Sequence, residues 1–204
     1  MNFFYPFLVS FLLVFVSELG DKTQLLVLSV ANKDKIYKIL FGVTIGSFMS
    51  HGLAILFGSN ISLISSSNFH LILKFITYIS FIFIGLISIV ARKESLNYKY
   101  TFKDNFIKKI SNLKINYCFT IALCILIGEI GDKTFLASIG LALQYPNFKL
   151  SLIFGAVAAM VLCNFLVLLL GKLLNKYISA TFMDKFSAIL FFIIGFLGLA
   201  SIFK

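Results

Sequence analysis

Long apolar segments occupy most of this 204-residue chain and restrict it to a membrane fold. Hydrophobic residues make up 60% of the sequence and charged residues 13%, whereas soluble domains carry about 25% charged residues. The apolar segments are about 20 residues long, which is the length that a helix needs to cross the hydrocarbon core of a bilayer. We therefore predict a single polytopic all-α domain over residues 1–204 with the lipid bilayer as its partner.

The apolar pattern predicts six transmembrane helices. They are Phe3–Ala31, Ile36–Gly58, Leu71–Ala91, Tyr117–Leu143, Leu150–Asn175 and Met183–Phe203. The first and fourth are too long for one straight crossing, and a Gly-Asp-Lys sequence interrupts each of them, so we expect tilted or locally broken helices there. The polar stretch from Ser59 to Asn68 is expected to be an outer loop.

Lys and Arg residues concentrate on one side of the predicted helices. If the N-terminus lies outside, most of the 18 basic residues fall in the inner loops, above all in the loop 92–116. Inner loops of membrane proteins carry this excess, so both termini are expected outside and the basic loop in the cytoplasm. The net charge of +10 therefore reflects topology and gives no reason to expect nucleic-acid binding. Binding of anionic lipid by the loop stays open.

An internal repeat organises the chain. Glu18-Leu-Gly-Asp-Lys-Thr23 recurs 111 residues later as Glu129-Ile-Gly-Asp-Lys-Thr134. The match continues through three further pairs, which are Gly42 with Gly155, His51 with Asn164, and Lys74 with Lys185. We predict a first repeat over residues 1–91 and a second over 117–204. Each has three helices, an odd number, so the second half must be inverted, an architecture associated with secondary transporters.

The two motifs place acidic residues within the membrane. Glu and Asp at positions i and i+3 are expected to share one helix face. A carboxylate at the centre of a membrane helix is costly and by default indicates a functional site. Carboxylate, hydroxyl and carbonyl oxygens suit magnesium, calcium or manganese. Repulsion and desolvation raise carboxyl pKa values, so the empty site should hold protons and release them when a cation binds. The predicted metal ligands are Glu18, Asp21, Glu129 and Asp132.

Other residues are candidates for the same site. They are Lys22, Thr23, Gln24, His51, Lys133, Thr134 and Asn164. The two lysines either balance the acids or extend away from them. His51 is either a neutral buried imidazole bonded to a neighbour or a site residue. Ser17, Ser47, Ser50 and Ser138 are expected to be helix-packing residues, and the three cysteines small hydrophobic residues without a disulfide or thiolate metal site.

The doubled E-x-G-D-[KR]-[TS] motif, the inverted repeat and the basic central loop resemble the family of Golgi calcium/manganese transporters and bacterial manganese exporters. The resemblance covers the whole chain. It implies exchange of a divalent cation, manganese or calcium, for protons, no other cofactor, and an ion site at Glu18, Asp21, Glu129 and Asp132. Gln24 follows the first motif whereas Phe135 follows the second, so the site is expected to be asymmetric. The short chain is similar to prokaryotic members, which implies manganese export across a bacterial inner membrane.

Two other functions are compatible with parts of the pattern. An exporter of amino acids or other organic solutes would use a similar six-helix scaffold with a larger and less acidic cavity. A membrane-embedded metal-dependent hydrolase would need a positioned water and a general base, but the sequence has no H-E-x-x-H and no polar catalytic loop. We therefore expect a transporter and not an enzyme.

Overall fold

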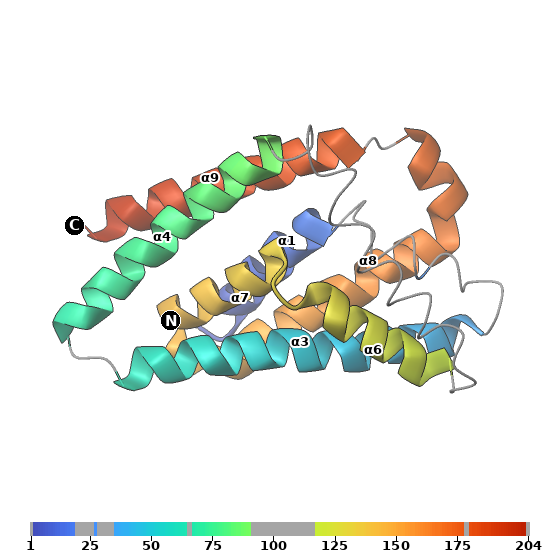
Figure 1. Ribbon diagram of the computed structural model, residues 1–204, viewed down its shortest axis with the longest axis horizontal. Coiled ribbons are helices and arrows are strands. Elements are labelled where there is room, and N and C mark those ends of the chain that lie inside the picture. The colour runs from blue at the N-terminus through green and yellow to red at the C-terminus, as the bar shows by residue number, and fades with distance from the viewer. Residues whose placement is uncertain are drawn as a thin grey trace.

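The computed structural model describes residues 2–18, 27, 35–64, 67–90, 117–177 and 180–202, and these are helical apart from short connections. Figure 1 shows the arrangement of the helices. They are α1 (Phe4–Glu18), α3 (Ile36–Ile64), α4 (Ser67–Val90), α6 (Tyr117–Glu129), α7 (Lys133–Gln144), the 3-10 helix η2 (Pro146–Phe148), α8 (Lys149–Tyr177) and α9 (Ala180–Ile202). The predicted all-α class is confirmed for these residues.

The described surface of the helices is strongly apolar. Phe83 and Phe196 each expose 60% of their surface and Leu197 exposes 67%. Soluble monomers rarely expose large contiguous apolar patches, so this surface is suited to lipid. Among the described residues, the segments Ile36–Ser62 and Pro146–Leu169 are long and apolar enough to cross a bilayer. The shorter apolar segments are Phe4–Glu18, Lys74–Leu86, Cys118–Glu129 and Ala188–Ile202.

The predicted outer loop from Ser59 to Asn68 is wrong for most of its length. Helix α3 continues to Ile64 and α4 begins at Ser67. The Ser59 hydroxyl donates to the Leu56 carbonyl at 3.1 Å, and the Ser62 hydroxyl donates to the Leu143 carbonyl of α7 at 3.1 Å. Serine hydroxyls that are satisfied by helix carbonyls in this way do not end a helix. Polarity alone was therefore a poor guide to this boundary.

The other helix boundaries agree with the predicted segments to within a few residues where the chain is described. Helix α8 extends beyond both ends of its predicted segment, and α9 begins three residues before Met183. Helix α1 ends at Glu18, and the remainder of the first predicted span lies outside the described residues except for Val27, which is helical and buried.

Helix packing follows the repeat and interleaves the two halves. The first helix of each half packs on the second helix of the other half, since α1 contacts α8 while α6 and α7 contact α3. Helices α3 and α8 also contact one another, and α4 runs along α9 (Figure 1). Each half therefore contributes to the packing of the other, and both are parts of one helical bundle.

Glycines mark equivalent contacts in the two halves. A Cβ placed on Gly42 would lie 2.5 Å from the carbonyl oxygen of Cys118, and one placed on Gly155 would lie 2.5 Å from that of Phe7. Cys118 and Phe7 are 111 residues apart, which is the spacing of the two motifs. Both glycines allow a helix backbone to approach more closely than any side chain would permit.

A second pair of glycines allows close backbone approach at the third helix of each half. A Cβ on Gly85 would lie 3.2 Å from the Ala188 carbonyl oxygen, and one on Gly195 would lie 3.0 Å from the Tyr78 carbonyl oxygen. Each residue of the first contact is 110 positions from its counterpart in the second. The repeat that the sequence predicts is thus visible in individual backbone contacts.

Candidate metal centre

The second motif breaks its helix. Helix α6 ends at Glu129 and α7 begins at Lys133, with Gly131 between them at a φ of 79°. This left-handed conformation is easily adopted by glycine because it has no Cβ. The Asp132 N–H donates to the Glu129 carbonyl at 2.9 Å, which closes the turn. The predicted local break is confirmed here, whereas the expectation that Glu129 and Asp132 share one face of a continuous helix is wrong.

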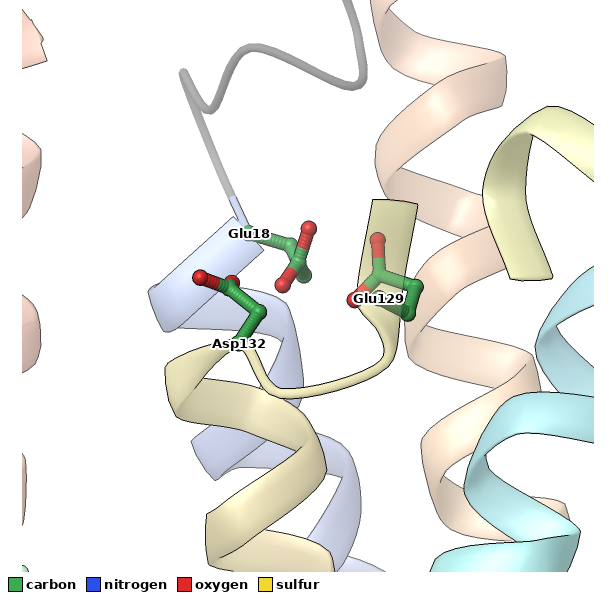
Figure 2. Close-up of side chains that lie close together, drawn as sticks. All are labelled: Glu18, Glu129 and Asp132. Carbon is green, nitrogen blue, oxygen red and sulfur yellow. The ribbon is translucent and has the colours of Figure 1, made fainter. Parts of the chain in front are cut away.

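Three carboxylates converge at this break. Glu18 is the last residue of α1, Glu129 is the last residue of α6, and Asp132 precedes the first residue of α7. One carboxylate oxygen from each lies within 4.8 Å of the others. Figure 2 shows the three side chains directed toward one another from the two halves of the chain. The repeat therefore brings motif acids 111 residues apart into one cluster.

Burial makes this cluster a strong attractor of positive charge. Glu18 and Glu129 are each only 1% exposed, and Asp132 is half-buried. Carboxylates this close repel one another, and their repulsion is greater in a medium of low dielectric constant than in water. A bound cation or protons must balance them. Oxygen ligands of this kind suit hard divalent ions.

Thr134 orients one of these acids. Its hydroxyl is buried in the first turn of α7 and donates to Oε2 of Glu129 at 3.1 Å. Hydrogen bonds of this kind to a ligating carboxylate fix its direction. Lys133 precedes Thr134 and is half-buried. The predicted candidates of the first motif, Asp21, Lys22, Thr23 and Gln24, lie outside the described residues.

The two polar residues at matching repeat positions, His51 and Asn164, are both buried but make different contacts. Nδ1 of His51 on α3 lies 2.9 Å from the Ser138 hydroxyl on α7. The Asn164 amide nitrogen on α8 instead donates to the Met160 carbonyl of its own helix at 2.9 Å. His51 thus links two helices of different halves, whereas the bond from Asn164 stays within its helix.

Ser138 was not among the site residues predicted from the sequence. It was expected to be a packing residue, yet it is the hydrogen-bond partner of His51. It lies four residues after Thr134 and so on the same face of α7. That spacing was a visible signal, but the partner on α3 depends on tertiary packing.

Cys163 connects α8 to the end of α1. Its thiol donates a weak hydrogen bond to the Phe15 carbonyl at 3.3 Å, one turn before Glu18. Cys118, Cys124 and Cys163 are all free thiols. Cys124 and Cys163 are buried and Cys118 is half-buried.

Two interleaved repeat halves, an apolar surface and carboxylates buried at a helix break define a membrane transporter by class. The chain matches the family model "Divalent cation/proton antiporter GDT1" over residues 6–96 and 117–204, and it belongs to that family. The match leaves out most of the basic central loop and covers both repeat halves. This is a family of transporters and not of enzymes.

Two relatives extend this comparison. The chain is 29% identical over 188 residues to a protein of Vibrio cholerae serotype O1 named "Putative manganese exporter", which covers 90% of this chain and 84% of that protein. It is 38% identical over 56 residues to a GDT1-like protein of Schizosaccharomyces pombe, which covers 28% of this chain and 21% of the yeast protein. No solved structure matches the chain.

Proposed function

We propose that this protein exports manganese from a bacterial cell in exchange for protons. The observation that carries the proposal is the convergence of Glu18, Glu129 and Asp132, from both halves of the chain, within 4.8 Å. Two buried acids and one half-buried acid need cationic compensation, and the antiporter family supplies the two cations that would alternate there.

The proposed ion site has four carboxylates. Asp21 holds the position in the first motif that Asp132 holds in the second, so we include it with the three acids of the cluster. The hydroxyl of Thr134 orients Glu129, and Thr23 would act on Glu18 in the same way. Gln24 is a further oxygen ligand on one side only, because Phe135 replaces it in the second motif.

Exchange follows from the charge of this site. Four carboxylates around one divalent ion leave an excess of negative charge that protons or the motif lysines must balance. When the ion leaves, repulsion between the acids favours protonation, and when an ion enters, protons are released. Binding of the cation therefore displaces the protons, and binding of protons displaces the cation. No further cofactor is needed.

The proposed topology has six transmembrane helices in one domain over residues 1–204. The halves 1–91 and 117–204 are inverted relative to one another, the loop 92–116 is cytoplasmic, and both termini are outside. The interleaved packing of α1 on α8 and of α6 and α7 on α3 supports alternating access by one half moving against the other, since the cluster lies between them.

Manganese is favoured over calcium on the evidence of the bacterial relative. The Vibrio cholerae protein is similar over most of both chains and its name includes manganese export. A site of hard oxygen ligands accepts either ion, so ion preference must be measured.

The test is ion uptake into inside-out proteoliposomes. Manganese and calcium are each offered with and without an imposed pH gradient, and the Glu18→Gln, Glu129→Gln double variant serves as the blank. Asp104→Asn is the matched control, because it removes an acid from the basic loop and leaves the cluster intact. Gradient-driven manganese uptake that the double variant loses and the control keeps is expected. If neither ion moves with folded wild-type protein, the proposal fails and organic solutes become the substrates to test.

A further inference from the structure

A line of polar groups runs from the acid cluster along α7 to α3. Glu129 accepts a hydrogen bond from Thr134, and Ser138 lies one turn further along α7 on the same face. Ser138 in turn contacts His51 of α3 at 2.9 Å. Glu129, Thr134, Ser138 and His51 thus follow one another, with one helical turn, about 6 Å, between the two hydroxyl-bearing residues.

His51 has an unused polar atom at the end of this line. The imidazole is fully buried, and its Nε2 makes no hydrogen bond within the described part of the chain. A buried ring nitrogen without a partner is costly, so in a membrane protein it points to a function that uses it. An imidazole can accept a proton on one ring nitrogen and release one from the other, which suits it to pass protons on.

The positions that match His51 and Ser138 in the repeat do not hold residues that could carry a proton in this way. Asn164 stands where the first half has His51, and Val27 stands where the second half has Ser138. Val27 is buried and has no polar side-chain atom, while Asn164 does not titrate and bonds to its own helix. Among the described residues, the His51–Ser138 pair therefore has no counterpart at the matching positions of the other half.

In the proposed topology this line of groups leads to the outer side. Helix α7 follows the break at Gly131 and leads toward the outer face, and α3 runs outward from Ile36 to Ile64. His51 therefore lies between the cluster and the outside. Ser59 and Ser62 continue along the same face of α3 and are also buried, with Ile55 separating them from His51.

We propose that His51 carries protons between the outer side and the acid cluster, through Ser138 and Thr134. This inference rests on the proposed cation/proton exchange. An incoming proton binds Nε2, the proton on Nδ1 passes to the Ser138 oxygen, and Ser138 releases its own proton toward Thr134 and Glu129. The carboxylate ends protonated and the imidazole returns to neutral. The transfer from Ser138 to Thr134 requires one bridging water, because residues one helical turn apart are about 6 Å apart.

The ionisable groups around His51 come from the elements that pack against α3 and from α3 itself. Helices α6, α7 and α8 and the 3-10 helix η2 pack against α3. Their described side chains that titrate or carry charge are Cys118, Cys124, Glu129, Lys133, Lys149 and Cys163, with Tyr145 just before η2 and Tyr37 and Lys38 on α3 itself. In this part of the chain, the side-chain hydrogen bond of His51 is to Ser138. The proton therefore has a single defined exit from the ring toward the cluster.

The test separates proton transfer from ion binding. Full-length protein is reconstituted, and two fluxes are measured: exchange of radiolabelled manganese for unlabelled manganese at equal pH, which needs no net proton movement, and manganese flux driven by a pH gradient. The variant His51→Gln keeps a polar side chain of similar size but cannot titrate. Ser138→Ala removes the hydroxyl and Ser138→Thr restores it. Ser50→Ala is the matched control, since Ser50 is a buried neighbour that bonds only within α3.

The expected result is selective. His51→Gln and Ser138→Ala lower the gradient-driven flux by about tenfold or more and flatten its dependence on outer pH, whereas manganese/manganese exchange stays within about twofold of wild type. Ser138→Thr and Ser50→Ala keep both fluxes. An unchanged pH profile in His51→Gln overturns the inference, and so does a parallel loss of both fluxes, which would indicate a structural role. Absence of gradient-driven flux in wild-type protein would instead overturn the proposed exchange itself, and this inference with it.

Discussion

The helix contacts and the buried polar residues of this protein obey the repeat to different degrees. The contacts of Gly42 and Gly155 with carbonyl oxygens are the same in both halves, to the residue. The interior differs, because His51 bonds to Ser138 across two helices whereas Asn164 bonds within its own helix. In the proposed exchange, symmetric packing would allow two equivalent states to interconvert, and asymmetric polar residues would let the two states treat protons differently.

The largest effect is expected at the acids, where the halves should be equivalent. Asp21→Asn and Asp132→Asn should each lower manganese transport by about a hundredfold or more, because an amide cannot replace a carboxylate that binds the ion and takes up a proton. Flux in proteoliposomes measures this, with insertion checked by detergent extraction and monodispersity. Normal transport by either variant would show that the two motifs do not share a site.

A large loss of stability is expected at the paired glycines. Leucine at Gly42 or Gly155 would force apart backbones that approach within contact distance, and overpacking of this kind costs about 1–3 kcal/mol or more. The thermal unfolding midpoint in detergent should fall similarly in both variants. Gly52→Ala is the control, because apart from its chain neighbours and its own helix backbone no atom of the described residues lies within 4 Å of the added methyl. A fall in one variant only would show that the framework is less symmetric than its contacts suggest.

Substitutions at the helix break are expected to lower transport less, and by an amount that depends on the residue introduced. Gly131 has a φ of 79°, and a residue with a Cβ loses about 1–2 kcal/mol in this region, with Asn tolerated best. Gly131→Val should therefore reduce transport by about tenfold and Gly131→Asn by less. Rates measured beside thermal stability distinguish a displaced Asp132 from general unfolding. Equal activity of both variants would show that the ion does not need this break.

The apolar pattern was enough to predict the helices but not all of their ends. Helix α3 runs through Ser59 and Ser62 to Ile64 because both hydroxyls bond to helix carbonyls, a detail that polarity does not reveal. The break near Asp132 was visible as an interruption of an overlong apolar segment. Its consequence, that Glu129 and Asp132 leave a common helix face, depends on the backbone conformation of Gly131.

The candidate site could be predicted in part from the sequence, where the repeated motif indicated it. A duplicated motif predicts that acids from both copies meet, and Glu18 does lie against Glu129 and Asp132. The bond between His51 and Ser138 could not be predicted, because it joins residues 87 positions apart and depends on how α3 packs against α7. Repeat matching paired His51 with Asn164, and both are buried, but it did not indicate their hydrogen-bond partners.

The smallest effect on stability is expected at a helix contact that both halves share but that only one half supports with a hydrogen bond. The Ser10 hydroxyl donates to the Leu152 carbonyl at 2.9 Å beside Gly155, whereas the equivalent residue, Ile121, packs against Gly42 without such a bond. Ser10→Ala should lower stability by only about 0.6 kcal/mol, the average for hydrogen bonds between membrane helices, as measured by unfolding in mixed micelles. A loss of several kcal/mol would mean that α1 and α8 depend on this bond more than on close backbone packing, and the two halves would then differ in what holds them together as well as in what lies inside them.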